Sequence, residues 1–225
     1  MQAKTDLSKY SNKEYNPGNI FARILWYIIG ECLVNSMIPG SFWRVLLLRM
    51  FGSKIGKGVV IKPYVKIKYP WKLEIGDYTW IGEHVWIDNL GKVKIGSNAC
   101  ISQGAMLLCG NHNYKKVTFD LIVRGIVIED GAWIGAKCVV CPGVVVKSHS
   151  VITVGSIVIQ STEPYTIYQG NPAIKLRERV IENNRIFTAL STKKCNFLTK
   201  NKLSYFKQRG QERKTLLTSV LCLVW

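Results

Sequence analysis

The sequence predicts a mainly β fold in which short strands wind into a parallel coil with a six-residue repeat. Three observations predict it: an aliphatic residue recurs every six positions, a small or slim residue precedes it by two positions, and glycine directly follows several of them. Strand positions two apart share a face, whereas a helix of 3.6 residues per turn gives no six-residue period. We therefore predict that three strand-and-corner units complete each turn of the coil.

The aliphatic anchors recur every six residues over 55–107, with two extra residues after every third anchor, and resume after the loop in six-residue steps over 128–158. They are Ile55, Ile61, Ile67, Ile75, Ile81, Ile87, Ile95, Ile101, Leu107, Ile128, Ile134, Val140, Val146, Ile152 and Val158. The small residues before them leave room inside a narrow coil. We interpret the glycines after five anchors, Gly56, Gly76, Gly82, Gly96 and Gly135, as corner residues that need a free backbone.

The helical and polar stretches on either side of the repeat divide the chain further. We predict a polar N-terminal tail (1–19), a helical cap (20–52), the coil (53–172) with a loop at 108–127, and a basic C-terminal segment (173–225). Residues 20–38 predict an amphipathic helix with Phe21, Leu25, Ile28 and Cys32 on one face, and 42–50 a second helix. Two interpretations of the cap stay open: it packs on the coil, or it leans on a membrane or on membrane-bound machinery.

Composition narrows the class of protein and its partners. The 225 residues are 48% apolar, which excludes a wholly disordered chain and fits one domain. The net charge of +17 favours anionic partners, but no nucleic-acid-binding motif occurs. The seven cysteines include Cys138 and Cys141, which have two residues between them, but no second such pair occurs, and this argues against a disulfide framework or a structural zinc site. We expect a cytoplasmic protein, with a peripheral position at the inner face of the membrane as the alternative.

The anchors stop in the loop, which contains His112 between Asn111 and Asn113. An imidazole titrates near neutral pH and can take a proton from a hydroxyl group, so His112 is the candidate base. The alternative is an ordinary exposed loop histidine. We interpret His84 and His149 as residues of the coil and its corners.

Four stretches resemble a known family: WIGEHVWIDN (80–89), ISQGAMLLCGNHNY (101–114), FDLIVRGIVIEDGAWIGAKCVVCPGV (119–144) and EPYTIYQGNPAIKLRERV (163–180). They are similar to the hexapeptide-repeat O-acetyltransferases of maltose, galactosides and nodulation factors, and more so to the colanic-acid branch. The resemblance implies a left-handed parallel β-helix, an acetyl-CoA donor and direct transfer to a sugar hydroxyl of a surface polysaccharide. It also implies a homotrimer with acetyl-CoA between neighbouring subunits, and no metal.

The resemblance also implies roles for individual residues. His112 matches the catalytic base, but Asn113 stands where the family often has Asp, so Asp88 and Glu83 become candidate partners of His112 through coil stacking. Their other interpretation is that of polar corner residues. Backbone groups of Gly135, Ala136 and Thr153 match the positions that bind pantetheine. Lys175, after the turn Asn171-Pro172-Ala173, matches a basic residue near the CoA phosphates.

Other functions remain open at this stage. An N-acetyltransferase acting on an amino-sugar nucleotide would use the same chemistry, and a non-catalytic β-helix could serve as a scaffold. The γ-class carbonic anhydrases share the fold, but His84, His112 and His149 lack the closely spaced histidine pair that the resemblance would require. Cys109 could suggest an acyl-thiolate, or be a small apolar corner residue. The tail 183–225 could bind an anionic membrane or polyanion, or be a disordered basic extension.

Overall fold

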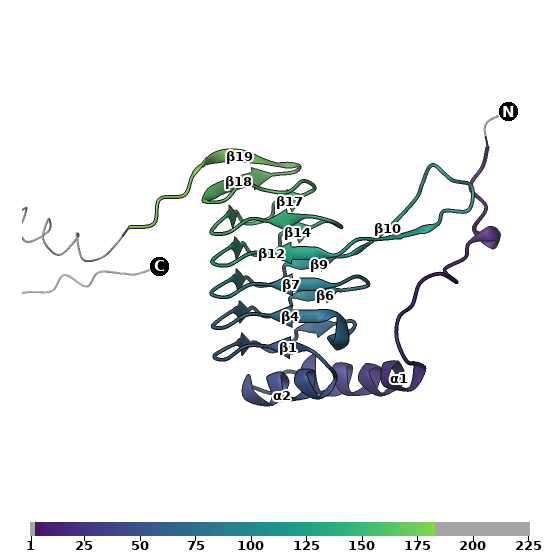
Figure 1. The fold of residues 1–225 in the computed structure, drawn as a ribbon, viewed down its shortest axis with the longest axis horizontal. Helices are drawn as coiled ribbons and strands as arrows, with labels where there is room; N and C mark the ends of the chain where they lie inside the picture. The colour runs from purple at the N-terminus through teal and green to yellow at the C-terminus, as the bar shows by residue number, and fades with distance from the viewer. Residues whose placement is uncertain (1–2, 183–225) are drawn as a thin grey trace, which may run out of the picture. The chain divides into compact units, whose positions relative to one another are not determined.

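The protein is a solenoid of three parallel sheets, as seen in a computed structural model that describes residues 3–182 (Figure 1). The first sheet contains β1 (Lys54–Ile55), β4 (Leu73–Ile75), β7 (Val93–Ile95), β12 (Ile126–Ile128) and β15 (Val145–Val146). The second contains β2 (Val60–Ile61), β5 (Trp80–Ile81), β8 (Cys100–Ile101), β13 (Trp133–Ile134), β16 (Val151–Ile152), β18 (Thr166–Gly170) and β19 (Ala173–Glu178). The third contains β3 (Lys66–Ile67), β6 (Trp86–Asp88), β9 (Met106–Leu108), β14 (Val139–Val140) and β17 (Ile157–Val158).

Each turn of the chain adds one strand to every sheet, and successive turns are in register. Ile75 pairs with Ile95 in the first sheet, for example, and Ile87 pairs with Leu107 in the third. The prediction of a mainly β, parallel coil is therefore confirmed. The predicted basic tail at 183–225 lies outside the described residues.

The core of the solenoid consists of the predicted anchors and the small residues two positions before them. All fifteen anchors are at most 9% exposed. The smaller partners, such as Thr79, Ala105 and Cys138, are buried beside them. Residues two apart in extended backbone share a face, so the anchor and the small residue that precedes its strand both point inward, as the sequence pattern predicts.

The corners are made by the third residue after an anchor, where the backbone is left-handed. φ is positive there at Tyr64, Tyr78, His84, Asn98, Gly104, Lys137 and His149, among others. The glycines directly after the anchors have no positive φ, so our interpretation of them as free-backbone corners is wrong. A Cβ on Gly135 would lie 2.6 Å from the carbonyl oxygen of Ile152 in the next coil. These glycines instead allow neighbouring coils to approach closely.

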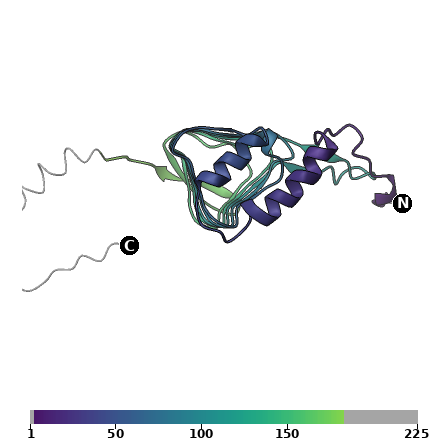
Figure 2. The same cartoon turned by 90° about the horizontal axis from the view of Figure 1, so that it is seen from below.

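Two helices close the N-terminal end of the solenoid (Figures 1 and 2). The α1 helix (Ile20–Ile29) begins at Asn19, whose side chain accepts hydrogen bonds from two backbone N–H groups of the first turn. A π-helical turn (Gly30–Val34) follows, and α2 (Phe42–Met50) comes after Pro39-Gly40. The single helix predicted over 20–38 is therefore shorter than expected, because the chain leaves α-helical geometry after Ile29.

The turn between the helices is held by Arg44, whose side chain is fully buried. Its guanidinium donates hydrogen bonds to the carbonyl oxygens of Val34, Ser36, Ile38 and Gly40. Several of these carbonyls follow the end of the π-helical turn, where oxygens lack partners within the helix. Burial lowers the pKa of the Arg44 guanidinium.

The apolar face predicted for the first helix points away from the solenoid. Phe21, Leu25, Ile28 and Cys32 are all exposed. The helix packs instead through Trp26, whose Nε1 donates a 2.9 Å hydrogen bond to the carbonyl oxygen of Ile67. The Trp26 ring lies 5.0 Å from that of Phe51. The cap does pack on the coil, but its long apolar face has no partner within residues 3–182.

The segment before α1 packs against the loop that leaves the coil. The backbone N–H of Asp6 donates to the carbonyl oxygen of Val117 at 2.9 Å, and a 3₁₀ turn (Leu7–Lys9) follows. The Tyr15 hydroxyl and the Lys72 ammonium both donate to the carbonyl oxygen of Leu90, at 2.9 and 2.7 Å. A second 3₁₀ turn (Pro70–Lys72) carries that lysine.

The other end of the solenoid is closed by a hairpin. β18 adds to the second sheet in parallel, and β19 folds back against β18 in antiparallel fashion. The sheet therefore continues past residue 172, where the sequence suggested that the coil ends. No helix within residues 3–182 is both long and apolar enough to cross a membrane.

Candidate active site

The predicted loop is an arm that projects from the solenoid between β9 and β12 (Figure 1). Its two strands, β10 (Gly110–His112) and β11 (Leu121–Val123), pair antiparallel, with His112 opposite Leu121. Near its tip Lys116 and Asp120 form a 2.9 Å ion pair. The arm therefore carries His112 on an ordered strand and away from the coil that it interrupts.

The His112 ring is oriented from within the arm. Its Nδ1 lies 3.0 Å from the carbonyl oxygen of Phe119, and its ring stacks on that of Phe119 with centroids 4.4 Å apart. Tyr10 from the N-terminal segment approaches the ring at 5.8 Å. A carbonyl oxygen can only accept, so Nδ1 carries the proton in this contact. The neutral ring then has its lone pair on Nε2, which has no hydrogen-bond partner among residues 3–182.

Neither candidate carboxylate orients His112 within one subunit. Asp88 pairs in register with Leu108 at the base of the arm, but its side chain forms a 2.9 Å ion pair with Lys68. The carbonyl oxygen of Glu83 accepts a hydrogen bond from the N–H of Gly104, in the turn between β8 and β9. Coil stacking therefore brings Asp88 to the base of the arm and does not bring Glu83 there. The Phe119 carbonyl occupies the position that we expected an acid to fill.

Cys109 lies at the base of the arm and is fully buried. Burial, with a smaller contribution from Asp88, raises the pKa of its thiol to about 11. Because the thiolate is the nucleophilic form, this thiol is almost entirely unreactive near neutral pH. The environment favours its interpretation as a small apolar residue of the core.

The three histidines lie at three different edges of the solenoid. His84 follows β5 and stacks on Tyr64, and His149 follows β15 and stacks on Tyr165, whereas His112 lies on the arm. Within residues 3–182 no cluster of three His, Cys, Asp or Glu side chains could hold a metal ion. The trio that a γ-class carbonic anhydrase would need does not converge in one subunit.

The residues matched to pantetheine binding form one corner between the second and third sheets. The N–H groups of Gly135 and Thr153 donate to the carbonyl oxygens of Ile152 and Tyr168, so both are already used between coils. The N–H of Ala136 has no hydrogen-bond partner among the described residues. The N–H of Val154, at the equivalent position one coil further, also has no partner among the described residues. Val154 was not among the residues expected from the sequence. At the preceding corner, between the first and second sheets, side chains accept hydrogen bonds from several equivalent N–H groups. The Asp77 carboxylate, for example, accepts one from the N–H of Lys57.

Lys175 lies on β19 in the terminal hairpin. Its ammonium contacts the carboxylate of Glu163, and this partner raises the pKa of Lys175. Both side chains are largely exposed. The pair leaves the lysine at the surface, where an anion could compete with Glu163.

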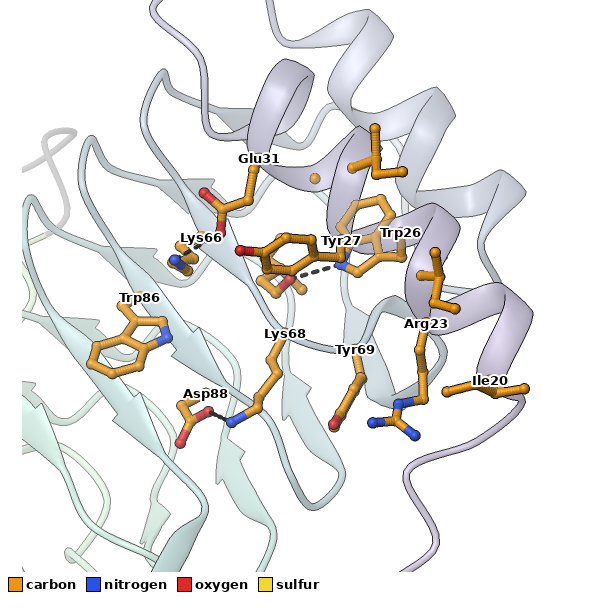
Figure 3. Close-up of a pocket in the computed structure, with 14 residues that line it drawn as sticks. Ile20, Arg23, Trp26, Tyr27, Glu31, Lys66, Lys68, Tyr69, Trp86 and Asp88 are labelled. Carbon is orange, nitrogen blue, oxygen red and sulfur yellow. Dashed lines mark hydrogen bonds and ion pairs between the residues drawn. The ribbon is translucent and has the colours of Figure 1, made fainter.

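A groove of about 580 Å³ runs between α1 and strands β3 and β6 (Figure 3). Its lining is mostly apolar and includes Ile20, Ile24, Trp26, Tyr27 and Trp86. Two ion pairs border it, Lys66 with Glu31 at 2.7 Å and Lys68 with Asp88 at 2.9 Å. The hydrogen bond from Lys66 lowers the pKa of Glu31. The groove extends from the exposed face of α1 toward the base of the arm.

Tyr10 and Phe119 contact His112 but were not among the site residues expected from the sequence. Tyr10 lies far away in the chain and Phe119 acts through a backbone carbonyl, so neither has a local sequence signal. An aromatic residue a few positions after a loop histidine could at most suggest a hairpin that stacks the two rings.

A triangular solenoid of hexapeptide coils, interrupted by one histidine-bearing arm, defines a class of acyl-transferring β-helix proteins, and known proteins bear this out. The chain is 39% identical over 178 residues to a protein of Escherichia coli assigned to colanic acid biosynthesis as the acetyltransferase WcaF, covering 78% of this chain and 97% of the relative. No family model matches the chain. The chain belongs to the hexapeptide-repeat acetyltransferases, in the branch that includes WcaF, and it is an acetyltransferase.

Solved structures agree with this assignment. The structure of a hexapeptide-repeat acetyltransferase of Vibrio cholerae in complex with acetyl-CoA matches with a TM-score of 0.65 and 25% identity, over 72% of this chain and 88% of that one. A galactoside acetyltransferase in complex with coenzyme A matches with a TM-score of 0.66 and 23% identity, over 78% and 86% of the two chains. The second likeness shows the shared fold.

Proposed function

We propose that the protein transfers an acetyl group from acetyl-CoA to a sugar hydroxyl during surface-polysaccharide biosynthesis, with His112 as the general base. The assignment of a relative to colanic acid biosynthesis and the acetyl-CoA complex of a structural neighbour support the class of acceptor and the donor, respectively. Acetyl-CoA as the donor also favours a cytoplasmic location.

The observation that carries the proposal is the orientation of the His112 ring. The Phe119 carbonyl holds Nδ1–H, which leaves the Nε2 lone pair to accept the proton of the acceptor hydroxyl. The hydroxyl oxygen then attacks the thioester carbonyl, a C–O bond forms, and the C–S bond breaks. The departing thiolate of CoA takes the proton back from the imidazolium. Direct transfer needs no thiol of the protein, in agreement with the raised pKa of Cys109.

The donor side of the site is assigned to Gly135, Ala136, Thr153 and Lys175. The close approach of coils at Gly135 and the unpartnered N–H of Ala136 suit a pantetheine arm that runs along this corner. Lys175 suits the phosphate end, as a cation that already binds a carboxylate. We retain no catalytic role for Asp88 or Glu83 in orienting His112.

A homotrimer would bring the two halves of the site together. The arm with His112 leaves the solenoid after β9, whereas Ala136 lies at the opposite edge of the third sheet. Exposed Trp80, Trp133 and Trp86 line the outer faces of the second and third sheets, as expected for faces that other subunits cover. We therefore propose that the arm of one subunit reaches the donor corner of its neighbour. Sedimentation that shows an active, stable monomer would contradict this.

The base assignment is tested by His112→Ala. Losing a general base typically reduces turnover by about 10²–10⁴-fold, and we expect a fall of this size with unchanged thermal unfolding. His84→Asn is the matched control, because Asn98 occupies the equivalent left-handed corner, and we expect it to keep parent activity. Near-parent turnover in His112→Ala would contradict the assignment.

The acceptor is tested with the parent enzyme, acetyl-CoA and a panel of sugars and amino-sugar nucleotides, with products identified by mass spectrometry. An ester, which hydroxylamine cleaves, supports transfer to a hydroxyl. A hydroxylamine-stable amide would identify an N-acetyltransferase instead. Absence of any CoA release with every acceptor would favour the scaffold.

A further inference from the structure

We propose that the helical end of the solenoid is a docking surface for an anionic lipid bilayer. We call it the cap surface, and it consists of the large exposed apolar side chains of α1, α2 and the turn between them. These are Ile20, Phe21, Ile24, Leu25, Tyr27, Ile28, Met37, Ile38, Phe42, Leu46 and Met50.

Each helix buries one side and exposes an apolar one. In α1 only Trp26 is buried, and Phe21, Ile24 and Ile28 lie on the opposite side of the helix at 100° per residue. In α2 Val45 and Leu48 face the first coil.

The exposed side of α2 shows the same arrangement. Phe42, Leu46 and Met50 recur every four residues on the side away from the coil, and Phe42 is 81% exposed. A helix that covers a solenoid end in a water-soluble monomer would normally present polar residues there. Apolar faces of this kind on both helices indicate a surface that is covered in the functional state.

The helices lie side by side across the end of the solenoid, roughly perpendicular to the direction in which the coils stack (Figures 1 and 2). Their exposed sides therefore share a broad surface rather than a deep pocket. An amphipathic helix at a bilayer lies in this way, with its axis in the plane of the interface and its apolar side among the acyl chains. With ten residues, α1 is about half the length that a span requires.

The charge around the cap surface is positive. Between Met50 and Leu73 the chain has six lysines and no Asp or Glu. Lys54, Lys66 and Lys68 have acidic partners, but Lys57 and Lys62 are exposed and form no ion pair within the described residues. Lysines at the edge of an apolar face can extend toward lipid phosphates while their stems cover apolar surface.

This charge decides between the two most plausible occupants. A second copy that docked end to end would bring two lysine-rich rims of the same sign together, which opposes association. An anionic bilayer instead complements the rim and covers the apolar side chains. The groove of Figure 3 opens beside this surface, but Lys66 and Lys68 along it are paired with Glu31 and Asp88, so the unpaired positive charge comes from Lys57 and Lys62.

The test is co-sedimentation of the full-length protein with vesicles of phosphatidylcholine alone or of an equimolar mixture with phosphatidylglycerol. We expect binding to the mixed vesicles that weakens as salt is raised. Phe21→Ser/Phe42→Ser should lower the partition coefficient about tenfold or more, because two large apolar side chains no longer enter the bilayer. Lys57→Glu/Lys62→Glu should lower it for the mixed vesicles only.

The matched control is Ile174→Ser/Val180→Ser, which removes two exposed apolar side chains at the other end of the solenoid. We expect it to bind vesicles as the parent does, while both cap variants keep the parent's thermal unfolding. Parent-like binding by Phe21→Ser/Phe42→Ser would overturn the proposal and assign any lipid binding to another segment. Absence of binding by the parent would overturn it too. A change in oligomeric state, measured without vesicles and seen only in Phe21→Ser/Phe42→Ser, would overturn it as well.

Discussion

The unpartnered N–H of Ala136 gives a sharp test of the donor site, because the fold itself shows how to remove it. Ala136 stands two residues after its anchor; Pro63 holds this position at the same corner of another coil, and Pro142 holds it after the next anchor. The backbone at this position therefore accepts proline. Ala136→Pro deletes one N–H without breaking any hydrogen bond between described residues.

The size of the effect follows from the contact that is lost. If that N–H donates to the pantetheine arm, its loss costs about 0.5–1.5 kcal/mol, the usual net value of one hydrogen bond. The KM for acetyl-CoA should then rise by about two- to thirteenfold. The turnover number should change little, because a contact far from the thioester is equally strong in the ground and transition states.

The assay is steady-state kinetics with varied acetyl-CoA and a saturating acceptor, accompanied by thermal unfolding. Ala136→Ser is the control, since it alters the side chain and keeps the N–H. An unchanged KM in a normally folded Ala136→Pro protein would refute the assignment of this corner to the donor. An equal increase in the Ala136→Ser control would show that crowding, and not the hydrogen bond, causes the effect.

Three further outcomes are expected. Cys109→Ala should retain parent turnover with an unshifted pH profile, since a thiol with a pKa of about 11 is protonated throughout the neutral range; a lost burst of acyl-enzyme would show that Cys109 acts as a nucleophile after all. Arg44→Met should lower the free energy of unfolding by about 1–3 kcal/mol, measured in urea, because buried carbonyls lose their donor; a stability equal to the parent's would show that water replaces the guanidinium. Lys175→Ala should raise the KM for acetyl-CoA a few-fold and Glu163→Gln should lower it, with neither effect when acetyl-dephospho-CoA is the donor, since the carboxylate competes with phosphate for this lysine. Equal effects on both donors would argue against phosphate binding at Lys175.

The sequence by itself determined the solenoid, its anchors and the position of the arm. Alternation along a strand is a property of the local backbone, so fifteen aliphatic residues six apart predict which side chains lie inside, and all of them do. It also singled out His112, because an interruption of a regular repeat is visible without any structure.

Only the tertiary structure decided which atoms surround these residues. Helical periodicity predicted the apolar face of the first helix, but the helix packs on the coil through Trp26, and the predicted face is exposed. A periodic pattern shows which side chains share a face and does not show what covers that face. Likewise, the partner of His112 is a backbone carbonyl, Phe119, rather than an acidic side chain. Every residue has a carbonyl, so its use as a partner depends on the register of the hairpin. That register depends on how β10 pairs with β11 and on the turn between them, so it involves residues well beyond His112 itself.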